Sequence, residues 1–203
     1  GKLPRDTYDA ADLISLAAHK IRGPKGVGAL ATRSTVHLRR MLFGGAQEKG
    51  LRPGTQDPVA CAGFAVAVER AKHMPTRYAA IAPLRDQLEE DLARIAEETG
   101  VVTTRNGEGP RASHVTNISF RGWIGPELCA ALDLEGVAVS SGSACSAGTA
   151  EPSPVLEAMV GRERALSAVR VSLGEDTTTD DIREALVRWQ RVLARAATHP
   201  RVT

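Results

Sequence analysis

Long apolar runs, a dominant sign of charge and paired cysteines are all missing from this 203-residue sequence. Its apolar runs are short and interrupted by charged residues, which excludes membrane-spanning helices. Lysine and arginine together number 26 against 24 aspartates and glutamates, and they are scattered, so neither nucleic acid nor a membrane surface is indicated as a partner. The first residues lack the basic-then-apolar pattern of an export signal, and a soluble cytoplasmic protein is expected by default.

The cysteines are few and differ in their surroundings. Cys61, Cys129 and Cys145 form no C-x-x-C pair and are odd in number, which argues against a disulfide framework and a metal cluster. Free cysteines usually behave as small buried apolar residues, and the apolar neighbours of Cys61 and Cys129 fit that behaviour. Cys145 differs, because residues 140–148 are small and let the backbone move. Such a loop suits a nucleophile that reaches into a site and carries its product out.

Lysine is also scarce, with five residues against twenty-one arginines, so each lysine is more informative than usual. A lysine just past a short strand is most often a solvated charge. Lys20, however, falls between a predicted buried strand and the turn at residues 23–26, where a desolvated amine could form a Schiff base. Lys20 is therefore a candidate cofactor anchor.

Hydrophobic spacing predicts the tail of an α/β domain followed by a compact α+β region. Buried strands are predicted at residues 13–16 and 27–31, and a buried helix over 57–72 that ends at 74–76. An amphipathic helix over 78–98 should end at Gly100, and Thr178 with Asp181 is a capping signal for the last helix. The remaining predicted strands are 101–102, 115–120, 137–139 and 169–171, and the remaining helices are 126–134, 153–160 and 180–196.

Four ordered motifs resemble those of the cysteine desulfurases, members of the class V aminotransferase group with fold type I. They are the lysine segment 12–30, the glycine-rich loop 44–55, the group I cysteine loop 140–146 and the segment 169–174. The resemblance implies an α/β fold that is the C-terminal half of a fold type I pyridoxal-phosphate enzyme. Residues 1–76 would be the last part of the large cofactor-binding domain, and residues 77–203 the small α+β domain with the catalytic-cysteine loop.

The resemblance also implies roles for five residues. Lys20 would bind pyridoxal 5′-phosphate and shuttle the Cα proton of L-cysteine, and Cys145 would take the sulfur as a persulfide, releasing L-alanine. His19 would lie near the cofactor phosphate, unless it is an ordinary core histidine. Thr55 would reach the phosphate of the neighbouring subunit in a homodimer, unless it only caps the next helix. Arg170 would hold the substrate carboxylate with its planar guanidinium, unless it is only an edge-strand cation. No metal ligand is indicated.

Two departures from the family limit these implications. Ala17 stands where many desulfurases have a serine that donates to the phosphate, so one hydrogen bond to a charged group, worth about 1.5 to 3 kcal/mol, is lost. Family members are longer, and their aspartate, glutamine and stacking histidine that contact the cofactor ring come earlier than this chain. A missing N-terminal half would have to complete the site.

Three functions therefore stay open from the sequence. A cysteine desulfurase would pass its persulfide sulfur to an acceptor protein, such as an iron–sulfur scaffold or a thiolation carrier. A selenocysteine lyase or another class V lyase would keep the fold and change the substrate. A truncated, inactive fragment that binds a partner half would hold no cofactor by itself.

Overall fold

The computed structural model describes residues 2–142 and 151–197. The chain divides into two compact units, Gly1–Arg77 and Tyr78–Thr203, and each is described by itself. The assignment of these units to a large cofactor-binding domain and a small domain stays a prediction. None of the helices in the described ranges is long and apolar enough to span a membrane.

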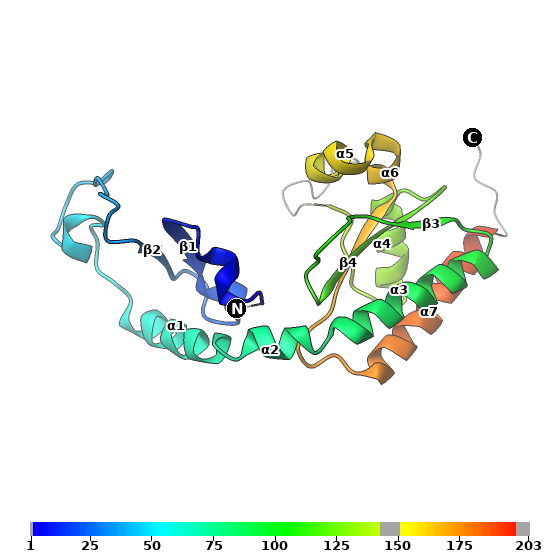
Figure 1. The fold of residues 1–203 in the computed structure, drawn as a ribbon, viewed down its shortest axis with the longest axis horizontal. Coiled ribbons are helices and arrows are strands. Elements are labelled where there is room, and N and C mark those ends of the chain that lie inside the picture. The colour runs from blue at the N-terminus through cyan, green and yellow to red at the C-terminus, as the bar shows by residue number, and fades with distance from the viewer. Residues whose placement is uncertain (1, 143–150, 198–203) are drawn as a thin grey trace. The chain divides into compact units, whose positions relative to one another are not determined.

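The first unit is built on an antiparallel hairpin (Figure 1). The strand β1 (Leu13–Ala17) pairs along its whole length with β2 (Gly28–Thr32). The other elements of the unit are η1 (Arg5–Tyr8), η2 (Ala18–Ile21), η3 (Glu48–Gly50), α1 (Pro58–Ala71) and the beginning of α2 (Met74–Ala79).

The prediction that the hairpin strands are buried is wrong. Leu13, Leu16 and Leu30 are 47%, 41% and 55% exposed. Continuous apolar strands are typical of sheets covered on both faces, and the described residues supply no such cover. The helix α1 was also expected to be buried, yet only Phe64 and Ala67 of it are.

Helix α1 begins where the sequence pattern places it, but its cap is different. Asp57 accepts hydrogen bonds from the backbone N–H groups of Val59 (2.9 Å) and Ala60 (3.0 Å), and Pro58 occupies the first turn. Asp57 is therefore the N-cap, and the alternative that Thr55 caps this helix is wrong. Residues 74–76 begin a second helix, α2, instead of only ending the first one, because Pro75 is tolerated in the first turn of a helix.

The second unit is an antiparallel sheet with helices packed on it. Its strands β3 (Thr103–Arg105), β4 (Val115–Phe120) and β5 (Ala168–Ser172) lie in the order β3-β4-β5. The helices α3 (Ala82–Glu98) and α7 (Thr179–Ala197) lie side by side (Figure 1). The remaining helices are α4 (Gly125–Leu134), α5 (Pro154–Val160) and α6 (Arg162–Leu166).

The core of this unit lies between the sheet and its long helices. Phe120 of β4 is fully buried, and its ring stacks on that of Trp189 in α7 with the centroids 5.0 Å apart. Ile118 is buried as well. Because successive strand residues point to opposite faces, Asn117 and its cross-strand partner Arg170 lie on the other face of the sheet.

The strands predicted at 101–102 and 137–139 are not formed at those residues, because the helices that precede them use the first backbone N–H of each segment. Gly100 ends α3 with φ +77°, and the N–H of Val101 donates to Ala96 O at 2.8 Å, which confirms the predicted cap. The backbone of residue 101 is thus used by the helix, and β3 begins two residues later. The N–H of Val137 likewise donates to Leu132 O at the end of α4, and residues 137–139 form no strand.

The helix predicted over 78–98 begins only at Ala82, because Ile81 is its N-cap and Pro83 lies in its first turn, and residues 78–79 belong to α2. Other element predictions agree closely with the structure. β4 spans the predicted residues, and the helices α4, α5 and α7 begin within one residue of the predicted positions. The N–H of Thr178 donates to Asp181 Oδ2 (2.8 Å) and the N–H of Asp181 to Thr178 Oγ1 (3.2 Å), so the predicted capping signal is confirmed. The short helix α6 was not predicted.

A group of charged side chains joins α3 to the segment between β3 and β4. Arg85, which is buried, donates to Ala112 O at 2.8 Å, and Arg111 donates through both terminal nitrogens to Glu89. Burial alone raises the pKa of the Glu89 carboxyl, but the hydrogen bonds and charge of Arg111 and the charge of Arg85 outweigh it and hold that pKa below its usual value. Glu89 therefore stabilises the fold above its unfolded-state pKa, and this contribution is lost as the pH falls through its folded-state pKa.

We predict that Glu89→Gln lowers the free energy of unfolding by about 1 to 2 kcal/mol near neutral pH, allowing for solvent screening, because Arg111 loses the carboxylate to which both its terminal nitrogens donate and Arg85 loses a nearby negative charge. The difference from the wild type should shrink as the pH falls below the ordinary range of a glutamate. Urea unfolding at neutral and acidic pH measures both effects. Glu90→Gln, at the exposed neighbouring position, is the control and should change stability by less than about 0.5 kcal/mol. A loss for Glu89→Gln that does not depend on pH would contradict the explanation.

Candidate functional site

The candidate cofactor anchor lies directly after the first strand of the hairpin. Ala18 is fully buried at the start of η2, whereas His19 and Lys20 are exposed. The Lys20 amine makes no hydrogen bond or ion pair with any residue that the structure describes. The expected desolvation of Lys20 is therefore wrong for this chain, and so is the alternative of a buried core histidine at His19. The reason is the same for both, since the hairpin beside them has no covering layer among the described residues.

Close backbone packing fixes the segment that carries Lys20. The N–H of Gly23 donates to Ala18 O at 2.8 Å, and a Cβ on Gly23 would lie 3.0 Å from the Cβ of Ala67 in α1. A Cβ on Gly63 of the same helix would lie 2.6 Å from Cγ of Pro24. The two glycines thus let η2 and the following turn rest on α1. Lys20 is positioned by the fold of the first unit, even though its side chain is exposed.

Thr55 is exposed in the glycine-rich segment that precedes α1. This segment is held by side-chain contacts, in which the N–H of Gly54 donates to Gln47 Oε1 (3.2 Å) and Arg52 donates to Gly54 O (3.2 Å). In the described part of the chain, Thr55 makes no hydrogen bond to His19 or Lys20. The three predicted cofactor residues are therefore not joined by hydrogen bonds in this structure.

Arg170 lies on β5 and is tied through its backbone to the beginning of the cysteine loop. Its N–H donates to Ser140 O at 2.6 Å, and its C=O accepts from the N–H of Ser140 at 3.1 Å. Its side chain is exposed, and its guanidinium forms no ion pair with a described residue. The Arg170 guanidinium is thus exposed, as expected of a cation on an edge strand, and it is also available to a ligand.

Cys145 falls within residues 143–150, which lie outside the described residues. The described part of its loop, residues 140–142, is anchored at several points. Ser141 hydrogen-bonds the thiol of Cys129, and a Cβ on Gly125 of α4 would lie 3.0 Å from Cβ of Ser141. Burial raises the pKa of the Cys129 thiol, and the hydrogen bond from Ser141 opposes that rise. Residues 140–142, at the beginning of the loop, are therefore held against β5 and α4.

The two other cysteines differ from each other. Cys129 is half-buried, in rough agreement with the expectation of an apolar role, whereas Cys61 is exposed. The expectation that Cys61 is buried is wrong, because Phe64 and Ala67 are the buried residues of α1 and Cys61 is not among them. Among the described residues, no group of three or more histidines, cysteines, aspartates or glutamates is arranged to hold a metal ion.

A polar network on the face of the sheet opposite Phe120 was missed by the sequence reasoning. Arg164 of α6 donates from Nε to Asn106 Oδ1 at 2.6 Å, and Asn106 Nδ2 donates to Asn117 Oδ1 at 2.6 Å. Asn117 in turn lies opposite Arg170. Asparagine is uncommon in strands. Asn117 within the predicted strand 115–120 could therefore have indicated a polar network on this strand.

We use the name polar row for four residues that follow one another across this face: Asn106, Asn117, Arg170 and Ser140. Each is the pairing partner of the next. The polar row connects the predicted carboxylate-binding arginine with the beginning of the cysteine loop.

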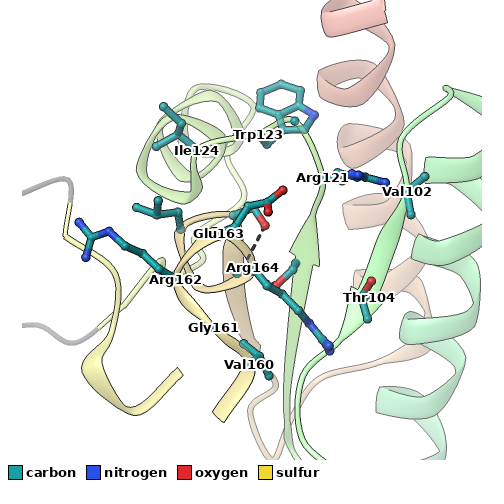
Figure 2. A pocket seen from close by; sticks show the side chains of 14 residues that line it. Val102, Thr104, Arg121, Trp123, Ile124, Val160, Gly161, Arg162, Glu163 and Arg164 are labelled. Atoms are coloured by element: carbon teal, nitrogen blue, oxygen red, sulfur yellow. Dashed lines mark hydrogen bonds between the residues drawn. The ribbon is translucent and has the colours of Figure 1, made fainter. Parts of the chain in front are cut away.

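A cavity of about 720 Å³ lies in the second unit, lined among others by Ser119 and Arg164. Figure 2 shows the Arg164 side chain extending from α6 towards β3 within it, and Arg164 donates there to Arg105 O. Trp123 and Ile124, which follow β4, form another wall. None of His19, Lys20, Thr55 and Arg170 lines this cavity.

Comparison with known proteins identifies the family. The family model described as Aminotransferase class-V matches residues 5–185. The chain belongs to this family. It is 36% identical over 206 residues to a cysteine desulfurase of Bradyrhizobium diazoefficiens, an alignment that covers 100% of this chain and 51% of that protein.

Solved structures of similar proteins superpose on this chain. A NifS-like protein superposes with a TM-score of 0.74 at 28% identity, over 92% of this chain and 47% of that one. SspA in complex with cysteine superposes with a TM-score of 0.58 at 33% identity, over 82% of this chain and 45% of that one. The α/β fold class, as one half of a fold type I enzyme, is confirmed, and the chain spans about half the length of the curated relatives it matches.

We predict that Ser140→Pro weakens the link between the cysteine loop and β5, because proline removes the N–H that donates to Arg170 O. The free energy of unfolding should fall by about 1 to 3 kcal/mol, and the Arg170 amide should exchange faster with deuterium. Ser140→Ala is the control, since it keeps both backbone hydrogen bonds and loses only the contact of the hydroxyl with Gly142 O. Equal exchange of the Arg170 amide in both variants would contradict the proposed anchoring.

Proposed function

We propose that this chain is the C-terminal half of a pyridoxal-phosphate-dependent cysteine desulfurase, which converts L-cysteine to L-alanine and transfers the sulfur to Cys145. The observation that carries the proposal is the backbone pairing of Ser140 with Arg170. Through this pairing, the loop that holds the acceptor cysteine starts beside the arginine that would bind the substrate. The match to cysteine desulfurases along the whole chain supports the same reaction.

Three residues of the first unit have the chemistry that pyridoxal phosphate requires. Lys20 presents an exposed amine on a segment fixed by close packing, as a covalent link to the cofactor aldehyde requires. His19, its exposed neighbour, would donate to the phosphate. Thr55 would contact the phosphate held by a second copy of the chain, which would make the enzyme a homodimer.

Arg170 is the proposed binding group for the substrate carboxylate. A guanidinium can donate two parallel hydrogen bonds to a carboxylate, and that of Arg170 makes no ion pair with the described residues. SspA, which resembles this chain, was solved in complex with cysteine, and this supports a cysteine substrate here. The carboxylate held at Arg170 would direct the rest of the substrate towards the cysteine loop.

The sulfur step is balanced without an external oxidant. The thiolate of Cys145 attacks the sulfur of the substrate, the C–S bond breaks, and an S–S bond forms. The electron pair of the C–S bond stays on the substrate carbon, which takes up a proton, and Lys20 moves the Cα proton in the course of the reaction. The cofactor, when bound, supplies the electron sink that makes this C–S bond breakable. The products are L-alanine and a persulfide on Cys145, whose sulfur would pass to an acceptor protein such as an iron–sulfur scaffold.

An N-terminal half would complete this site. The exposed apolar side chains of the hairpin, among them Leu13, Leu16 and Leu30, are suited to strands that further residues cover. The relatives are about twice as long as this chain, which supports the same inference. The ring contacts expected of the family would come from that half.

The test of this function uses the full gene product with Lys20→Ala. We expect this variant to lose the visible absorbance of the bound cofactor and to form no L-alanine from L-cysteine, because the amine that links the cofactor is gone. Lys25→Ala is the matched control, since Lys25 is exposed in the neighbouring turn and has no proposed role.

Three outcomes of this experiment separate the possibilities. Loss of both signals in Lys20→Ala and their retention in Lys25→Ala would support the proposal. A Lys20→Ala protein that still forms L-alanine at the wild-type rate would contradict it. A wild-type protein that turns over L-selenocysteine and not L-cysteine would point to a selenocysteine lyase.

A further inference from the structure

Asn117 lies next to Arg170 at the closest spacing that a pair of strands allows. The N–H and C=O of Arg170 are both bonded to Ser140, on the side of β5 away from β4. Arg170 and Asn117 are therefore a non-hydrogen-bonded pair of the antiparallel ladder. In such pairs the Cα atoms are about 4.5 Å apart and the side chains share one face. Asn117 is thus the β4 residue nearest to the Arg170 side chain.

The hydrogen-bond network fixes which way the Asn117 amide points. Arginine can only donate, so the oxygen of Asn106 must face Arg164, whose Nε lies 2.6 Å from it. The nitrogen of Asn106 then faces Asn117 and donates to its Oδ1. The oxygen of Asn117 is therefore directed at Asn106, and its amide nitrogen is directed elsewhere.

Ser119 fixes the orientation of the Asn106 side-chain amide. Its hydroxyl accepts from Asn106 Nδ2 at 2.8 Å and donates to the backbone O of Arg164 at 2.8 Å. Asn106 is only 6% exposed, so a flipped amide would lose these bonds without water to replace them. The Nδ2 group of Asn117 keeps two N–H donors, and no described residue accepts from them.

We propose that Asn117 donates a hydrogen bond to the α-carboxylate of the substrate beside Arg170. This inference rests on the proposed function, which places that carboxylate at Arg170. A carboxylate has two oxygens and about four acceptor positions, so two parallel bonds from a guanidinium leave room for another donor. Asn117 supplies that donor from the neighbouring strand, and Arg164 and Asn106 are positioning residues that orient it.

The test measures steady-state kinetics of the full gene product carrying Asn117→Ala. Loss of a hydrogen bond to a charged group should raise the KM for L-cysteine by roughly 10- to 100-fold, with kcat changed by less than about 3-fold. Thr104→Ala is the matched control, because Thr104 is exposed on β3 opposite Ser119 and outside the polar row. Its KM and kcat should equal those of the wild type.

A second measurement separates carboxylate binding from a structural role. Binding of cysteamine, which has the thiol and the amine of cysteine without the carboxylate, should be unchanged in Asn117→Ala. Equal weakening of cysteamine and L-cysteine, or an unchanged KM for L-cysteine, would overturn the inference. Asn117→Asp keeps the shape and the acceptor for Asn106, so it guards against misfolding, and it should raise the KM for L-cysteine by at least about 10-fold through charge repulsion.

The two proposals fail in different ways. A wild-type gene product that releases no L-alanine from L-cysteine would contradict the proposed function, and the inference with it. An active wild-type enzyme whose Asn117→Ala variant behaves like Thr104→Ala would contradict the role of Asn117 alone.

Discussion

Two backbone hydrogen bonds between Ser140 and Arg170 connect the parts of this molecule that matter for its chemistry. They join the beginning of the cysteine loop to the strand that carries the candidate carboxylate-binding arginine, although the two residues are far apart in sequence. Because these bonds use the backbone of Arg170 on the edge of β5 away from β4, the pair that strand register forms between Arg170 and Asn117 is a non-hydrogen-bonded one, in which the two side chains are close on one face. The polar row follows from this constraint, and Arg164 fixes its far end from α6.

The first unit contributes the other half of the proposed chemistry in a different way. Its segment around Lys20 is fixed by glycine contacts with α1, while its strands leave apolar side chains exposed. A fixed anchor beside an uncovered hairpin is what one half of a larger enzyme would present. The length of the relatives is in keeping with that interpretation.

Sequence reasoning predicted what depends on local contacts and failed where burial depends on distant residues. The end of α3 at Gly100 and the cap formed by Thr178 and Asp181 are set within a few residues, and both were predicted correctly. The burial of Leu30 was predicted wrongly, because it requires a covering layer that the described residues do not provide. The partnership of Asn117 with Arg170 depends on strand register, which no pattern within a single segment specifies.

The central claim is that Cys145 receives the sulfur that L-cysteine loses, and peptide mass mapping of the full gene product tests it most directly. After brief exposure to L-cysteine without an acceptor or a reductant, we predict one additional sulfur atom on the peptide that contains Cys145, together with an equal amount of L-alanine. The peptides that contain Cys61 and Cys129 should be unchanged. Formation of L-alanine with the additional sulfur on another cysteine, or on none, would contradict the account.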